Sequence, residues 1–243
     1  MALKFRRALL GDGFAVQLAR LQVLPPLKDA AQIRVDIERT FPHHPVQDLA
    51  EKLVEVLAMF ASQHPKVAYA QGQNFLCAPL FWVYWQDAPS YALKDTLYSL
   101  GRLHKLCLPL YPLDRRDGGP LIFCRAIARC LGSYFSNWNE EHNLYAQSYV
   151  LHFWGSLFAN LFSMEDVLVL WAFLVEPETD RERILRLFKF TLEMIRKHAR
   201  ILDLGGAAAF AFLSHPAVHQ VERLTRCLRE RGREDRWPVL PPI

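Results

Sequence analysis

The sequence has little of what holds small secreted proteins together or anchors proteins in membranes. Its 243 residues include only five cysteines, an odd number without close pairs. This argues against a disulfide framework and favours buried free thiols in a reducing compartment. The most apolar run, FLCAPLFWVYW at 75–85, falls short of the roughly 20 apolar residues that a membrane-spanning helix needs. The first residues show no secretory pattern, so we expect a soluble, cytoplasmic protein.

Neither sign of charge dominates the composition. There are 29 Lys and Arg against 25 Asp and Glu, a net charge of +4, and so mild an excess does not by itself indicate nucleic-acid binding. The phosphate-binding pattern G-x-x-x-x-G-K-[ST] is absent, so we do not expect the chain to bind GTP alone. A serine nucleophile elbow is absent as well. With 51% hydrophobic and 22% charged residues, the chain should fold around a substantial core.

Alternation of apolar and polar residues, the mark of strands, is also scarce. Apolar residues instead recur at helical spacing along most of the chain, for example at 49–60, 184–195 and 218–228. Prolines and glycines separate these stretches, and the longest break is PLYPLDRRDGGP at 109–120. The pattern predicts an all-α fold with a single domain. This domain could consist of two helical subdomains joined at the break.

Two polar segments need an explanation. In IRVDIERTFP at 33–42, Asp36 and Arg39 are three residues apart, so on a helical turn the carboxylate can orient the guanidinium. In YAQGQN at 69–74, amide side chains open an apolar helix, although burying an amide is costly unless its hydrogen bonds are made. An isolated Asp–Arg pair is usually a surface ion pair, so the combination of the two segments carries the argument.

Together, I-x-x-D-x-x-R-T-F-P and the following Y-x-Q-G-x-N resemble the TBC domain of Rab GTPase-activating proteins. In that family the first motif supplies an arginine finger and the second a glutamine finger, both beside the GTP of a bound Rab. The resemblance implies that Arg39 and Gln71 are the catalytic residues and that Asp36 orients the arginine. The other matched positions would be supporting residues: Ile33, Thr40, Tyr69, Gly72 and Asn74.

A third segment agrees with this resemblance. LFANLFSMEDVLVLWAFLV at 157–175 is similar to the family's late L-F…P-x-E-x-x-L-R-L-W-D segment. Val169 and Ala172 stand where the family has arginine and aspartate, Ser163 where it has proline, and Gln73 where methionine is common. Replacing both members of a polar pair is milder than losing one, because no partner is left uncompensated.

The resemblance extends over roughly 33–213. The family's early tryptophan-containing segment has no clear counterpart before it. We therefore divide the chain into a diverged N-terminal segment at 1–30, a TBC-like domain at 31–213, and a C-terminal helix with a proline-rich tail at 214–243.

The resemblance implies that the protein activates a Rab-type GTPase in its GTP state. It needs no metal or cofactor of its own, since the partner carries GTP and Mg²⁺, and no nucleic acid takes part. The setting would be vesicle trafficking, with the protein reaching endomembranes only peripherally, through the bound Rab.

Two other functions stay open at this point. A catalytically inactive TBC-like scaffold would bind a Rab or another helical partner, and the departures from the family pattern are compatible with it. A metal-dependent hydrolase would use His215 and His219, whose i, i+4 spacing can bind zinc, but no third ligand is evident. The arginine-rich segment at 221–236 mixes both signs of charge, which favours a solvated helix face over a membrane-binding one.

Overall fold

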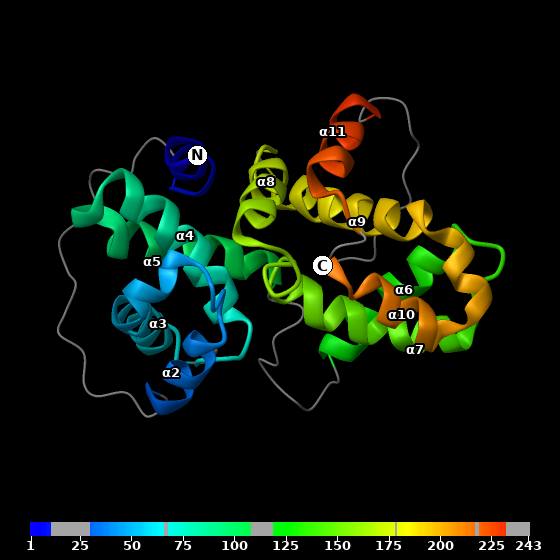
Figure 1. Cartoon of the computed structure of the whole chain (residues 1–243), viewed down its shortest axis with the longest axis horizontal. Coiled ribbons are helices and arrows are strands. Elements are labelled where there is room, and N and C mark those ends of the chain that lie inside the picture. The colour runs from blue at the N-terminus through cyan, green and yellow to red at the C-terminus, as the bar shows by residue number, and fades with distance from the viewer. Residues whose placement is uncertain (11–29, 66–67, 108–118, 178, 217–218, 232–243) are drawn as a thin grey trace. The chain divides into compact units, whose positions relative to one another are not determined.

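The computed structural model describes residues 1–10, 30–65, 68–107, 119–177, 179–216 and 219–231. The described residues form helices joined by turns, with no strand among them, which confirms the predicted all-α fold (Figure 1). The chain divides into two compact units, Met1–Leu106 and Cys107–Ile243. Most of the predicted break at 109–120 lies outside the described residues, and the domain boundaries that we assigned stay a prediction.

The first unit is built around a helix that is apolar on nearly all sides. In α4, most residues between Leu76 and Tyr84 are buried, so this helix lies in the core. The amphipathic α3 packs against it with its predicted stripe at 49–60, and α2 contacts both helices. The elements of this unit are α1 (Ala2–Phe5), the π-helical η1 (Arg6–Leu10), α2 (Ala30–Glu38), the 3₁₀ turn η3 (Pro45–Leu49), α3 (Ala50–Gln63), α4 (Gln73–Asp87) and α5 (Pro89–Cys107).

Apolar side chains among the first ten residues contribute to this core. Phe5 is fully buried, and the Arg6 guanidinium donates to Asp95 at 2.5 Å and to Asp87 while lying 5.1 Å from the ring centre of Tyr84. Burial raises the pKa of the fully enclosed Asp95, and the hydrogen bond from Arg6 opposes that rise. The arginine therefore compensates a carboxylate that would otherwise be unpaired in the interior.

Side-chain caps begin three of the helices described in the second unit. Asn139, Ser163 and Thr179 each accept a backbone N–H from the first turn that follows, which satisfies a donor that the helix itself cannot. Ser163, at the family's proline position, thus has a defined role. The elements are α6 (Gly119–Gly132), α7 (Glu140–Tyr149), the π-helical η6 (Val150–Trp154), α8 (Met164–Leu174), α9 (Asp180–Lys197), the 3₁₀ helix η7 (Ala199–Leu204), α10 (Gly206–Leu213) and α11 (Val221–Arg231).

The core of the second unit is rich in aromatic rings whose polar atoms are paired. Trp154 Nε1–H donates to Thr191 Oγ1, and Trp171 Nε1–H donates to the Leu157 carbonyl, both at 2.9 Å. In α8 the positions of the family's arginine and aspartate hold a partly buried valine and a buried alanine. This part of the helix therefore packs through apolar contacts.

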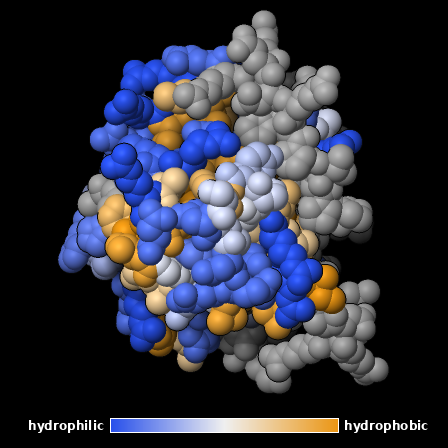
Figure 2. All heavy atoms as spheres, turned by 90° about the vertical axis from the view of Figure 1, so that its right-hand side faces the viewer, coloured by the Kyte–Doolittle hydropathy of each residue, from blue (hydrophilic) through white to orange (hydrophobic). Residues whose placement is uncertain are grey.

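The structure shows free cysteines and a mainly hydrophilic surface. All five cysteines are free, and Cys77, Cys107 and Cys124 are buried. On the face shown in Figure 2, hydrophilic residues cover most of the described surface, and hydrophobic ones form separate small patches. No helix within the described ranges is both long and apolar enough to cross a membrane.

Candidate functional site

Arg39 lies just beyond a helix end and directly before the buried Thr40. α2 ends at Glu38, and the side chain of Arg39 is exposed, whereas Thr40 is fully buried. The Thr40 N–H donates to the Ile37 carbonyl at 2.9 Å, and Phe41 has a φ of 50°, in the left-handed region. The chain thus turns sharply here and leaves the arginine on the surface.

Gln71 lies in a tight turn that leads into α4. Ala68 and Gly72 have φ angles of 53° and 108°, and only glycine adopts such values freely. The Gln73 N–H donates to the Ala70 carbonyl at 3.2 Å as the helix begins. Gln71 is exposed at this turn, so the amide that seemed out of place before an apolar helix faces solvent.

One buried side chain holds both segments. Asn74 is 2% exposed; its Nδ2 donates to Thr40 Oγ1 at 2.7 Å, and its Oδ1 accepts the Gly72 N–H at 2.9 Å. Thr40 follows Arg39 in the chain and Gly72 follows Gln71. Asn74 therefore ties together the two backbone turns from which the predicted fingers project.

A second tie runs through Asp36, although it differs from the prediction. The hydroxyl of Tyr69 donates to Asp36 Oδ2 at 2.9 Å, and Gln32 Nε2 donates to Oδ1 at 3.2 Å. Within the described residues, no hydrogen bond or ion pair joins Asp36 to Arg39. α2 ends at Glu38, directly before Arg39, and the Asp36 carboxylate accepts from Tyr69 and Gln32. The orienting role of Asp36 stays a prediction.

The backbone of Asp36 is also held. Its carbonyl accepts from Thr40 Oγ1 at 2.7 Å and from Asn74 Nδ2 at 3.3 Å. Ile33, one turn before Asp36 on α2, is fully buried. All six predicted supporting positions, which we call the frame, are thus buried or partly buried: Ile33, Asp36, Thr40, Tyr69, Gly72 and Asn74.

Sequence reasoning missed three contributors to this frame. Gln47 Nε2 donates to the Ile37 carbonyl at 2.9 Å and also to the Thr40 carbonyl. Gln73, noted in the sequence only as a departure from the family, is fully buried and lies 3.3 Å from the Nε2 of the buried His104. Burial lowers the pKa of His104 to about 4, helped by the nearby His64, so this imidazole is neutral at physiological pH.

The histidines of the metal hypothesis do not form a ligand set. His215 is exposed, while His219 is buried and donates from Nε2 to the Leu213 carbonyl at 2.7 Å. Burial lowers the pKa of His219 to about 4. In the part of the chain that the structure describes, no three His, Cys, Asp or Glu residues group as metal ligands would.

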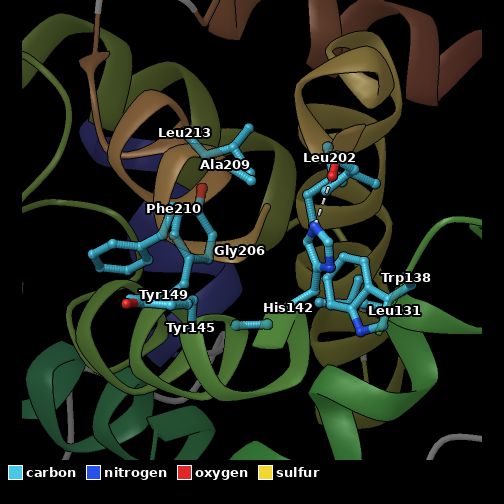
Figure 3. Close-up of a pocket in the computed structure, with 12 residues that line it drawn as sticks. Leu131, Trp138, His142, Tyr145, Tyr149, Leu202, Gly206, Ala209, Phe210 and Leu213 are labelled. Atoms are coloured by element: carbon cyan, nitrogen blue, oxygen red, sulfur yellow. Dashed lines mark hydrogen bonds between the residues drawn. The ribbon is translucent and has the colours of Figure 1, made fainter. Parts of the chain in front are cut away.

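A pocket in the second unit lies between α6, α7, α9, η7 and α10 (Figure 3). Its empty space is about 340 Å³, including the part open to solvent, and its walls are mainly apolar. His142 Nε2 donates to the Leu202 carbonyl at 2.9 Å, and Trp138 Nε1 donates to Asn143 Oδ1 at 2.8 Å. These polar groups are engaged within the fold and form no catalytic set around the pocket.

Residues 14–202 match the Rab-GTPase-TBC domain family, and the chain therefore belongs to that family. It is similar to the GTPase-activating protein GYP5 of Saccharomyces cerevisiae (strain ATCC 204508 / S288c), with 31% identity over 120 residues. That match covers 44% of this chain and 13% of the relative, so the chain spans a small part of the relative's length.

The fold has a counterpart among solved structures. The chain is similar to the crystal structure of the Ypt/Rab-GAP domain of Gyp1p, with a TM-score of 0.60 and 19% sequence identity. The similarity covers 93% of this chain and 77% of the other. At this identity, the comparison establishes the helical fold.

Proposed function

We propose that this chain accelerates GTP hydrolysis by a Rab-type small GTPase in its GTP state, using Arg39 and Gln71 as fingers supplied in trans. The single observation that carries the proposal is the frame around Asn74. It fixes the residues that follow both predicted fingers and leaves the two side chains exposed. The family membership, and the GTPase-activating function for which both relatives are named, support the same function.

Arg39 would act on the charge that develops during phosphoryl transfer. In the transition state, charge spreads over the γ-phosphate oxygens and the bridging oxygen, and a small GTPase alone neutralises it poorly. A guanidinium can donate two directed hydrogen bonds to phosphate oxygens. Arginine fingers of this kind are worth roughly 10³–10⁵ in rate.

Gln71 would act on the attacking water. A neutral amide both accepts from water and donates to a phosphate oxygen, so it can hold the nucleophile in line with the bond that breaks. Its place in a turn with two positive φ angles, and not inside a helix, lets backbone and side chain approach a bound nucleotide closely.

Under this proposal the chain carries no cofactor, since GTP and Mg²⁺ arrive with the partner. The protein is cytoplasmic, takes part in vesicle trafficking, and meets endomembranes peripherally through the bound Rab. Selectivity among Rabs would reside in exposed side chains around the two turns.

The test is single-turnover hydrolysis by a panel of GTP-loaded Rabs. Wild-type protein should accelerate one or a few of them, and Arg39→Ala, Arg39→Lys and Gln71→Ala should each lower that acceleration by about 10²-fold or more. Exposed controls of the same residue types are Arg102→Ala on α5 and Gln86→Ala at the far end of α4, which should behave as wild type. Full activity of Arg39→Ala or Gln71→Ala would contradict the mechanism. Tight binding of a GTP-loaded Rab without acceleration would indicate the scaffold instead.

A further inference from the structure

The buried amide of Gln73 closes the turn that presents Gln71. Gln73 is the first residue of α4 and is fully buried. Its Oε1 accepts the Ala70 N–H at 3.3 Å, and its Nε2 donates to the Ala68 carbonyl at 3.4 Å. One side chain thus binds the turn at two residues, Ala68 and Ala70, which both precede Gln71 in the chain.

These contacts fix the orientation of the Gln73 amide, and this orientation in turn fixes the protonation state of His104. A backbone N–H can only donate and a carbonyl can only accept, so Oε1 must face Ala70 and the amide nitrogen must face Ala68. The second amide hydrogen then points to His104 Nε2 at 3.3 Å. That nitrogen must accept, so the ring is neutral with its proton on Nδ1, in agreement with its burial.

The turn needs such support because its backbone is unfavourable. Ala68 has a φ of 53° although it carries a Cβ, and a residue held in this region persists only when its surroundings enforce it. The bond from Gln73 to the Ala68 carbonyl acts on that residue directly. A methionine, common in the family at this position, would fill similar space but could make neither bond.

We propose that Gln73 is a positioning residue for Gln71 and that His104 completes it as the acceptor for the amide. This inference rests on the proposed function, because it assigns Gln73 an effect on the rate only through Gln71. The frame contains a counterpart for the other finger: Gln47 binds the carbonyls of Ile37 and Thr40, on either side of Arg39.

The experiment compares Gln73→Met with Gln47→Met in two backgrounds, wild type and Gln71→Ala, using a Rab that responds in the panel. In the wild-type background, Gln73→Met should lower the maximal single-turnover rate about tenfold, with the Kd for the Rab loaded with a non-hydrolysable GTP analogue unchanged. In the Gln71→Ala background, Gln73→Met should have no further effect, because the side chain that it positions is gone. Gln47→Met should still lower the residual rate there, because it acts beside Arg39.

A second measurement needs no GTPase. Hydrogen exchange at the Ala70 amide should become at least about tenfold faster in Gln73→Met and stay unchanged in Gln47→Met. His104→Phe, which keeps a ring but removes the acceptor, should also speed this exchange, and ¹⁵N NMR should show unprotonated Nε2 in the wild-type ring. Unchanged exchange in Gln73→Met would overturn the closure of the turn, whatever the activity.

The outcomes separate this inference from the proposed function. Full activity of Gln71→Ala, or no responding Rab, contradicts the glutamine finger and removes the positioning role with it, while the exchange result still decides whether Gln73 closes the turn. If Gln71→Ala is impaired but Gln73→Met lowers the rate equally in both backgrounds, the finger stands and the positioning role is wrong.

Discussion

At the residue scale, the candidate site separates exposed chemical groups from the buried groups that hold them. Arg39 and Gln71 lie on the surface, whereas Asp36, Thr40 and Asn74 are at most 4% exposed. Buried polar groups of this kind contribute most when every hydrogen bond is made, and leaving one unmade is expensive. Changes at the two sets of residues should therefore have different signatures, in the reaction rate for the first and in stability for the second.

Removing the tyrosine hydroxyl that holds Asp36 tests the second signature. Tyr69→Phe removes the hydroxyl that donates to Asp36 Oδ2. Because hydrogen bonds to charged groups are worth about 1.5–3 kcal/mol, we expect the free energy of unfolding to fall by about that amount. Urea denaturation measures it. Tyr91→Phe on α5, where the side chain is exposed, should stay within about 0.5 kcal/mol of wild type. Equal effects of the two variants would show that the bond to Asp36 does not stabilise the fold.

At this scale, the sequence predicts which residues matter better than it predicts the contacts that they make. The motif match predicts the supporting residues of the frame, but it predicts neither their hydrogen-bond partners nor the contributions of Gln47, Gln73 and His104. Spacing suggested that Asp36 faces Arg39, and the structure pairs it with Tyr69 and Gln32 instead. Tyr69 lies 33 residues from Asp36 in the chain, and a local pattern does not contain contacts at that separation.

At the element scale, close approach between helices and loops limits which side chains fit. A Cβ on Gly132, the last residue of α6, would lie 2.4 Å from the indole of Trp138. A Cβ on Gly101, within α5, would meet only Phe60 at an ordinary 3.9 Å. The two glycines thus serve different purposes, since only the first is required by packing.

The matched pair of alanine substitutions should change stability in opposite directions. Gly132→Ala must displace Trp138 and strain its hydrogen bond to Asn143, which should destabilise the protein by about 1–3 kcal/mol. Gly101→Ala should stabilise it by about 0.5–1 kcal/mol, because alanine favours the helix and has room. Thermal and urea unfolding measure both. A neutral Gly132→Ala would mean that the loop carrying Trp138 moves freely.

Elements were easier to predict than the turns between them. The apolar stripe at 49–60 became α3, with Leu53, Val56, Leu57 and Phe60 buried as expected. The positive φ angles of Phe41 and Ala68 had no signal in the sequence, because residues with a Cβ adopt them only when surrounding contacts require it. These two turns flank the candidate fingers, so the least predictable backbone lies next to the proposed chemistry.

At the scale of the whole molecule, two buried histidines make stability depend on pH. His104 and His219 each have a pKa lowered to about 4, mainly by burial, against about 6.5 in an unfolded chain. Below pH 6.5 the unfolded chain binds protons that the folded chain excludes, so stability should fall as the pH drops toward 4. At pH 5 the expected loss is about 2 kcal/mol per histidine relative to pH 7.

Urea denaturation at pH 7 and pH 5 checks this dependence. His104→Phe and His219→Phe should each show a smaller difference between the two pH values than wild type, whatever their stability at pH 7. His215→Phe, which changes an exposed histidine, should retain the wild-type difference. If the free energy of unfolding falls by the same amount between pH 7 and pH 5 in all three variants, the pH dependence belongs to other groups.

The bridge formed by Asn74 has a consequence for how such a domain can diverge. Because one side chain supports both turns, a change at position 74 alters both segments at once, and selection for a stable fold acts against it even where no GTPase is activated. Arg39 and Gln71 carry no such burden, since they are exposed. Descendants that lose the activity should therefore keep the buried frame and differ at positions 39 and 71, so an intact frame reports ancestry while the two exposed positions report present use.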